Sequence, residues 1–136
     1  MTPPVFDKLN LKGQLEILVL NSPASFEKQL SALAGVRVHR RLEGLKELQF
    51  ALAFVTMRVE LDRVSAALAK RAAGDALLWF AYPKGSSKKY GCDFNRDEGW
   101  DVLQKSGFDS VRQVAIDEDW SALRFRRVEF IKRPAR

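Results

Sequence analysis

Residues 15–26 read LEILVLNSPASF, and this stretch decides the class of fold. Its first half, residues 15–20, is a short apolar run rich in branched residues, which is typical of a strand buried on both faces of a parallel sheet. Its second half begins a helix, with Ser22 as the predicted N-cap and Pro23 at the first helical position, where the missing N–H costs nothing. A buried strand that runs directly into a helix is the first unit of an α/β fold.

The rest of the chain continues this alternation. We predict that the helix that begins at Pro23 ends at Gly35. Further helices are predicted over 58–73 and 97–106, and strands over 36–42, 48–56, 76–82, 111–116 and 123–131. Residues 36–42 alternate apolar with polar side chains, which favours a place near an edge, whereas 48–56 is almost wholly apolar and should be central. The polar turn at 117–119 is too short for a helical crossover, so the last two strands should form an antiparallel hairpin.

This order of elements predicts a Rossmann-like α/β fold, a three-layer sandwich with helices on both faces of a mostly parallel sheet that ends in the hairpin. A length of 136 residues suits one hydrophobic core, so we predict one domain over residues 1–136. Residues 1–14 and 134–136 are expected to be loosely held ends. Trp79 is expected inside its strand, with Trp100 and Trp120 as packing anchors.

Composition restricts the classes of function. A hydrophobic fraction of 46% and a charged fraction of 29% are ordinary for a globular domain. The apolar runs are far shorter than the roughly 20 residues of a membrane span, and no signal peptide is visible. The single cysteine, Cys92, fits a reducing compartment, so we expect a cytoplasmic protein with no membrane partner. The net charge of +6 is concentrated in residues 124–136, beside an acidic block at 93–119 that can neutralise it, which makes nucleic acid an unfavoured partner.

Three stretches, AYPKGSSKKY (81–90), DFNRDEGW (93–100) and VRQVAIDEDWSALRF (111–125), resemble a family of small uncharacterised bacterial proteins. The most specific portions are YPK at 82–84 and VAIDEDWSALRF at 114–125. That family looks like a reduced class I methyltransferase fold with some parts missing. The resemblance implies a sheet order of 2-1-3-4-6-5, with the strands numbered along the chain, and it implies no particular activity.

The segment after the first strand argues against a nucleotide cofactor. An adenosyl or dinucleotide site needs glycines at this place, as in G-x-G-x-x-G, because the main chain must approach the cofactor. Residues 21–26 read NSPASF without a glycine, so Cβ atoms, a proline ring and a phenyl group would occupy that approach. Glu43, just beyond the second strand, is a candidate ribose-binding acid, although an exposed acid there is usually only a solvated charge. We therefore predict no cofactor.

Ligands of open α/β sheets collect at the carboxyl ends of the strands, near the switch in strand order, here between the first and third strands. A helix N-terminus with hydroxyls and nearby lysines suits a small anion. The candidate ligand-binding residues are Asn21, Ser22, Ser25, Arg58, Tyr82, Lys84, Ser86 and Ser87. The alternative interpretation is structural: Ser22 caps its helix, and the lysines of the loop at 83–90 keep that loop soluble.

Other site chemistries have weaker support. His39 and Cys92 are single copies, too few for the usual nitrogen and sulfur ligands of zinc. The successive acids at 117–119 suit Mg²⁺ or acid–base chemistry, but we expect them to pair with Arg124 or Arg126 instead. We therefore predict no metal site and assign no catalytic residue.

Three functions remain open. The leading one is a non-catalytic domain, related to methyltransferase-like folds without a cofactor loop, that binds a small anion or a protein partner. The second is a small enzyme that uses the strand-end cleft, with Tyr82, Lys84 and Asp117 as its polar groups, and it requires these groups to converge. The third is nucleic-acid binding through residues 124–136 and the lysine loop.

Overall fold

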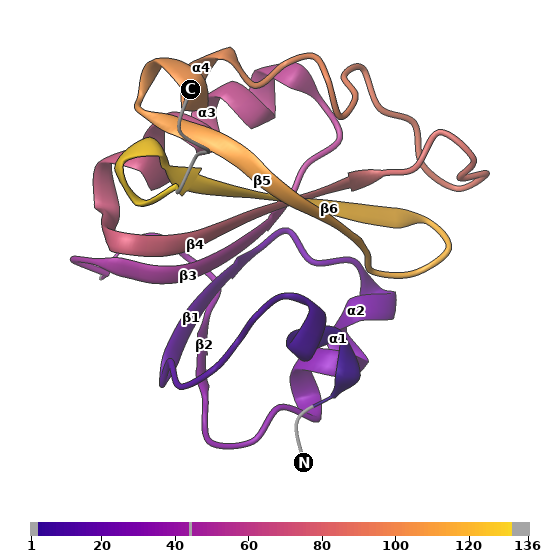
Figure 1. Ribbon diagram of the computed structural model, residues 1–136. Coiled ribbons are helices and arrows are strands. Elements are labelled where there is room, and N and C mark those ends of the chain that lie inside the picture. The colour runs from indigo at the N-terminus through magenta and orange to yellow at the C-terminus, as the bar shows by residue number, and fades with distance from the viewer. Residues whose placement is uncertain (1–2, 44, 132–136) are drawn as a thin grey trace.

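The computed structural model describes residues 3–43 and 45–131. Within these ranges the chain forms a six-stranded sheet with the order β2-β1-β3-β4-β6-β5 (Figure 1). The strands are β1 (Glu16–Leu20), β2 (Arg37–His39), β3 (Leu48–Phe54), β4 (Ala72–Pro83), β5 (Phe108–Ala115) and β6 (Trp120–Arg127). The helices of the same ranges are α1 (Pro4–Lys8), α2 (Ala24–Ser31), α3 (Arg58–Arg71) and α4 (Asp101–Lys105), followed by the short 3₁₀ helix η1 (Val128–Phe130). The predicted α/β class and strand order are confirmed.

The sheet is parallel from β2 to β4 and antiparallel from β4 through β6 to β5. β3 lies in its centre, as predicted, and no side chain from Phe50 to Phe54 is more than 2% exposed. β2 lies at one edge, also as predicted, although it is shorter than the expected segment 36–42. The hairpin of β5 and β6 forms the other edge, so the predicted antiparallel ending is confirmed.

Helices cover both faces of the sheet (Figure 1). α3 and α4 pack on one face through residues such as Leu61, Leu68 and Leu103. α1 and α2 pack on the other face through residues such as Phe6 and Phe26. Because side chains alternate along a strand, β3 and β4 contribute to both cores, which gives the predicted three layers. None of the helices in the described ranges reaches the length and hydropathy of a membrane-spanning segment.

The tryptophans are packing residues, as predicted. Trp79, Trp100 and Trp120 are 0%, 4% and 3% exposed. The indole N–H of Trp100 donates to the Asn95 carbonyl at 2.9 Å. The ring of Trp120 meets that of Phe54 edge-on, with the ring centres 5.0 Å apart. Trp100 therefore belongs to the core under α3 and α4, and the other two belong to the core under α1 and α2.

The prediction that residues 1–14 form a loosely held end is wrong for the described part of that segment. Pro4–Lys8 form α1, and Phe6 and Leu9 are fully buried. The buried indole N–H of Trp79 donates to the Leu9 carbonyl at 2.8 Å, which fixes the segment to the sheet. Five residues are too few to show a helical period, so the sequence pattern could not reveal this helix. The other predicted loose end, 134–136, lies outside the described residues.

The helix predicted over 97–106 is shorter than expected and begins only at Asp101. The backbone of Gly99 has φ of 108°, which no right-handed helix contains. Before it, the side-chain oxygen of Asn95 accepts the backbone N–H of Asp97 at 2.8 Å. Asparagine competes for backbone donors in this way and favours turns over helices, so the acids that suggested a helix start lie in a turn.

Candidate functional site

Asn21 lies at the carboxyl edge of the sheet, where the strand order switches between β1 and β3. It directly follows β1 with φ of 57°, a left-handed conformation that asparagine tolerates better than most residues. Its side-chain amide donates to the Phe54 carbonyl at 3.5 Å and to the Glu60 carboxylate at 3.4 Å. The other oxygen of Glu60 accepts the Thr56 N–H at 3.3 Å. A polar link between β1 and β3 thus occupies the place where the fold favours a ligand.

Ser22 belongs to a second cluster, which joins α2 to the end of β2. Its hydroxyl donates to the Glu27 carboxylate. Arg40 binds the two oxygens of that carboxylate through Nη1 and Nη2, at 2.6 and 2.8 Å. Arg40 Nη1 also donates to the Ser22 hydroxyl at 3.1 Å. The Arg40 and Ser22 hydrogen bonds lower the pKa of Glu27 from 4.5 to about 2.

Ser22 is not the N-cap of α2, so that prediction is wrong. Pro23 occupies the cap position, the helix begins at Ala24, and no side chain caps it. The Ser22 hydroxyl instead binds a charged carboxylate, which is a stronger acceptor site than a neutral group. Ser25 lies exposed in the first turn of the same helix. The role of Arg40 was not predicted, because the sequence pattern placed this residue inside the strand 36–42, whereas β2 ends at His39.

Arg58 faces carboxylates of the helices, away from the serines of the β1 loop. Its Nη2 donates to Asp101 at 3.2 Å, and its Nε lies 3.9 Å from Asp62. Its backbone N–H donates to the Asp93 carboxylate at 2.6 Å. Arg58 therefore joins the start of α3 to α4 and to the segment before it.

The loop after β4 is anchored on the turn of the β5–β6 hairpin. The Lys84 N–H donates to the Asp119 carbonyl at 2.8 Å, and the Ser87 hydroxyl donates to the Asp119 carboxylate at 2.9 Å. Tyr90 packs against Trp120 in a tilted arrangement, with ring centres 4.8 Å apart. Ser86, like the lysines that follow Ser87, is exposed. The loop is therefore solvent-facing, as predicted, and Lys84 lies beside the acidic turn.

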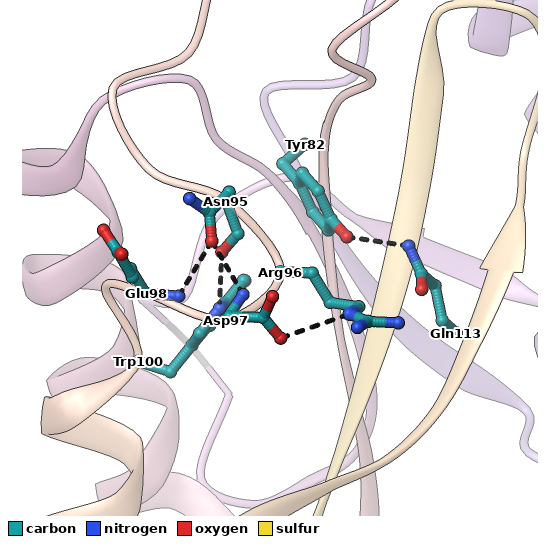
Figure 2. A network of polar contacts seen from close by, with 7 residues as sticks. All are labelled: Tyr82, Asn95, Arg96, Asp97, Glu98, Trp100 and Gln113. Carbon is teal, nitrogen blue, oxygen red and sulfur yellow. Dashed lines mark hydrogen bonds and ion pairs between the residues drawn. The ribbon is translucent and has the colours of Figure 1, made fainter.

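Tyr82 lies on the opposite face of the sheet from Trp120. Its buried hydroxyl accepts a hydrogen bond from Gln113 of β5 at 2.9 Å (Figure 2). Arg96, also drawn in Figure 2, donates from its Nε to the Asp97 carboxylate at 3.3 Å. Burial raises the pKa of Tyr82, which the Arg96 charge partly opposes.

The candidate residues thus have different hydrogen-bond partners. Asn21 binds Glu60, whereas Ser22 binds Glu27 and Arg40. Arg58 binds Asp101, Tyr82 binds Gln113, and Ser87 binds Asp119.

In the part of the chain that the structure describes, the acids of the hairpin turn form no ion pair with Arg124 or Arg126, so that prediction is wrong. Asp117 accepts the backbone N–H groups of Asp119 and Trp120 at 2.8 and 2.9 Å, which shapes the turn. Arg126 binds Asp75 instead. The turn leaves backbone N–H groups without partners, and these groups compete with the arginines for the Asp117 carboxylate. An aspartate at the start of a turn commonly accepts such hydrogen bonds. Within the described residues, no group of three or more acidic, histidine or cysteine side chains is placed to hold a metal ion.

A cavity of about 700 Å³ lies at the other end of the strands. Its lining includes Glu16 of β1, Arg37 and His39 of β2, and Gln49 of β3. The His39 ring lies 3.4 Å from the Glu16 carboxylate. Sequence reasoning missed this cavity because it placed ligands only at the carboxyl ends of the strands, and only the polar residues of β2 hinted at an open surface.

Known structures share this fold. A SAM-dependent methyltransferase from Aquifex aeolicus aligns with a TM-score of 0.63 and 18% identity, over 92% of this chain and 88% of that chain. The N-methyltransferase NodS from Bradyrhizobium japonicum WM9 aligns at 0.57 and 12%, over 91% and 92%. The mitomycin 7-O-methyltransferase MmcR aligns at 0.63 and 11%, over 91% of this chain and 53% of that chain. No family model and no curated protein matches the sequence. The likeness shows the fold, which is the methyltransferase-like Rossmann fold.

Proposed function

We propose that this chain is a methyltransferase-fold domain that binds no adenosyl cofactor and acts, without catalysis, by binding a small anion or a protein partner. The cluster of Ser22, Glu27 and Arg40 is the observation that supports this best. In sheets of this type, the main chain after the first strand lies against the cofactor, and an acid near the end of the second strand binds the ribose. Here Arg40 follows β2, and its guanidinium is already bonded to Glu27.

The link between Asn21 and Glu60 supports the same proposal. It bridges β1 and β3 at the switch in strand order, where the methionyl part of an adenosyl cofactor needs open main chain. Glu43, the sequence-based candidate for a ribose-binding acid, lies farther along the chain and is exposed. The Asn21–Glu60 link therefore occupies the edge at the switch in strand order, and no acid directly follows β2.

The lysine loop supports an anion as one class of ligand for this edge. Ser86, Lys88 and Lys89 are exposed in this loop, and the main chain of Lys84 fixes the start of the loop to Asp119. The alternative function, a small enzyme with Tyr82, Lys84 and Asp117 as its polar groups, is supported by the position of Lys84 near the turn that contains Asp117. It is weakened because the Tyr82 hydroxyl is bonded to Gln113 and the Asp117 carboxylate to backbone N–H groups.

Isothermal titration with S-adenosylmethionine and S-adenosylhomocysteine tests the proposal. We expect no saturable heat up to about 1 mM ligand, the concentration at which even a binding free energy of roughly −4 kcal/mol would be detected. The Aquifex methyltransferase serves as the positive control in the same titration. Native mass spectrometry of the purified protein is the second measurement. A bound adenosyl ligand in the spectrum, or micromolar affinity in the titration, would overturn the proposal.

A further inference from the structure

Arginine side chains gather on one face of the β5–β6 hairpin. Arg112 and Arg124 are directly paired across the two strands, so their side chains leave the sheet on the same face. Arg126 lies two residues beyond Arg124 on β6 and shares that face. On the other side of β6, Arg124 is paired with the buried Trp79 of β4. Arg124 is therefore the centre of the group.

The carboxylates of this face lie on the side of Arg126. Its Nε and Nη2 donate to the two oxygens of Asp75 at 2.7 and 2.6 Å, a bidentate pair. Asp109 of β5 is also paired across the strands with Arg126. The opposite side of the group, formed by Arg112 and Arg124, is where positive charge is concentrated.

Arg124 has the least satisfied side chain of the group. Its guanidinium is half-buried, and its Nε–H is buried without a hydrogen-bond partner among the described residues. A guanidinium has five N–H donors and keeps its charge, so an unpaired buried donor is costly. Burial, followed by the charges of Arg126 and Arg112, lowers the pKa of Arg124, while Asp75 acts in the opposite direction. An anion bound at the exposed part of the guanidinium would relieve the repulsion among these arginines.

We propose that Arg112 and Arg124 form a binding site for a small oxyanion of the phosphate class on this face of the hairpin. The planar guanidinium matches the spacing of phosphate oxygens and binds them in a bidentate manner. Arg126 is already paired with Asp75 and bounds the site on that side. A nucleic acid fits less well, because Asp75 and Asp109 would face its next phosphates.

Titration with inorganic phosphate at constant ionic strength, followed by the arginine Nε–H signals in ¹H–¹⁵N spectra, tests the site. We expect saturable shifts of the Arg112 and Arg124 signals, and little change when chloride replaces phosphate. Arg112→Gln removes an exposed partner and should weaken phosphate binding by about tenfold, the worth of a charge-assisted hydrogen bond. Arg37→Gln, which removes a 74% exposed arginine on β2, is the matched control and should leave binding unchanged.

Arg124→Gln should abolish the phosphate-dependent shift of the Arg112 signal. If the Arg124→Gln protein does not fold, the exposed substitution Arg112→Gln still tests the site. The absence of a saturable shift with phosphate, or equal affinity in wild type and Arg112→Gln, would overturn the inference. So would tight binding of a single-stranded oligonucleotide with a steep salt dependence in place of phosphate binding. The site lies away from the carboxyl edge, so its failure would leave the proposal on the adenosyl cofactor intact.

Discussion

At the scale of single residues, the carboxyl edge is organised by charge-assisted hydrogen bonds within the protein. Glu27 accepts from Arg40 and from Ser22, and these bonds lower its pKa from 4.5 to about 2. A carboxyl group with a lowered pKa in the folded state stabilises that state at pH above its unfolded pKa. The stabilisation is then lost as the pH falls through the folded pKa, here between 4.5 and about 2.

The substitution Glu27→Gln tests this electrostatic contribution. Because the pair is partly exposed, we expect a loss of only about 0.5–1 kcal/mol in the free energy of unfolding at pH 7. The difference from wild type should shrink as the pH falls from 4.5 towards about 2. Urea denaturation across this pH range measures it. Glu118→Gln, an exposed acid of the hairpin turn, is the control, and a difference that stays constant with pH would contradict the assignment.

At the scale of elements, α1 shows how a short segment is held by tertiary contacts alone. A helix of five residues is unstable by itself, because nucleation costs more than one turn of hydrogen bonds returns. Phe6 is fully buried, and its ring lies 5.8 Å from that of Phe26 on α2. Together with the Trp79 bond to the Leu9 carbonyl, this packing makes α1 part of the core.

We therefore expect Phe6→Ala to destabilise the protein strongly. Truncation of a fully buried phenylalanine costs about 3–5 kcal/mol, from lost burial and the cavity that remains. Leu15→Ala, at a side chain 74% exposed, should change stability by less than about 0.5 kcal/mol. Denaturant unfolding of both variants measures the difference. A loss below about 1 kcal/mol for Phe6→Ala would mean that α1 is only loosely attached in solution.

At the scale of the whole molecule, the sheet connects two cores. β3 and β4 send alternate side chains to each face, so Ala51 and Ala53 pack under α3 and α4, while Phe50, Leu52 and Phe54 pack under α1 and α2. Loss of one core exposes one whole face of the central strands. The two cores should therefore unfold in one cooperative transition.

Two tryptophan probes, one in each core, test this cooperativity. A variant that keeps Trp79 reports the core under α1 and α2, and a variant that keeps Trp100 reports the core under α3 and α4. In each variant, with the other tryptophans replaced by phenylalanine, the fluorescence midpoint in urea should coincide with that of far-ultraviolet circular dichroism. A Trp100 signal that changes at lower urea than circular dichroism would show two independent units.

Much of the fold was predictable from sequence, and much of the site was not. The apolar runs at 48–56 and 76–82 identified the central strands, because only strands buried on both faces lack polar alternation. The candidate site residues were chosen because ligands of open α/β sheets bind at the carboxyl ends of the strands. That rule places the residues in the sheet, but it does not predict their hydrogen-bond partners. Ser22 was expected to cap α2, but its hydroxyl instead donates to Glu27 and accepts from Arg40.

The amino-acid sequence by itself determined the alternation of strands and helices, the central and edge strands, and the absence of glycine from the first loop, because these depend on local periodicity and residue type. Only the tertiary structure decided that α1 is buried, that Arg40 closes the first loop, and that Arg112 and Arg124 share one face. Those contacts join residues far apart in the chain, and they form only when the sheet brings their strands and helices into register.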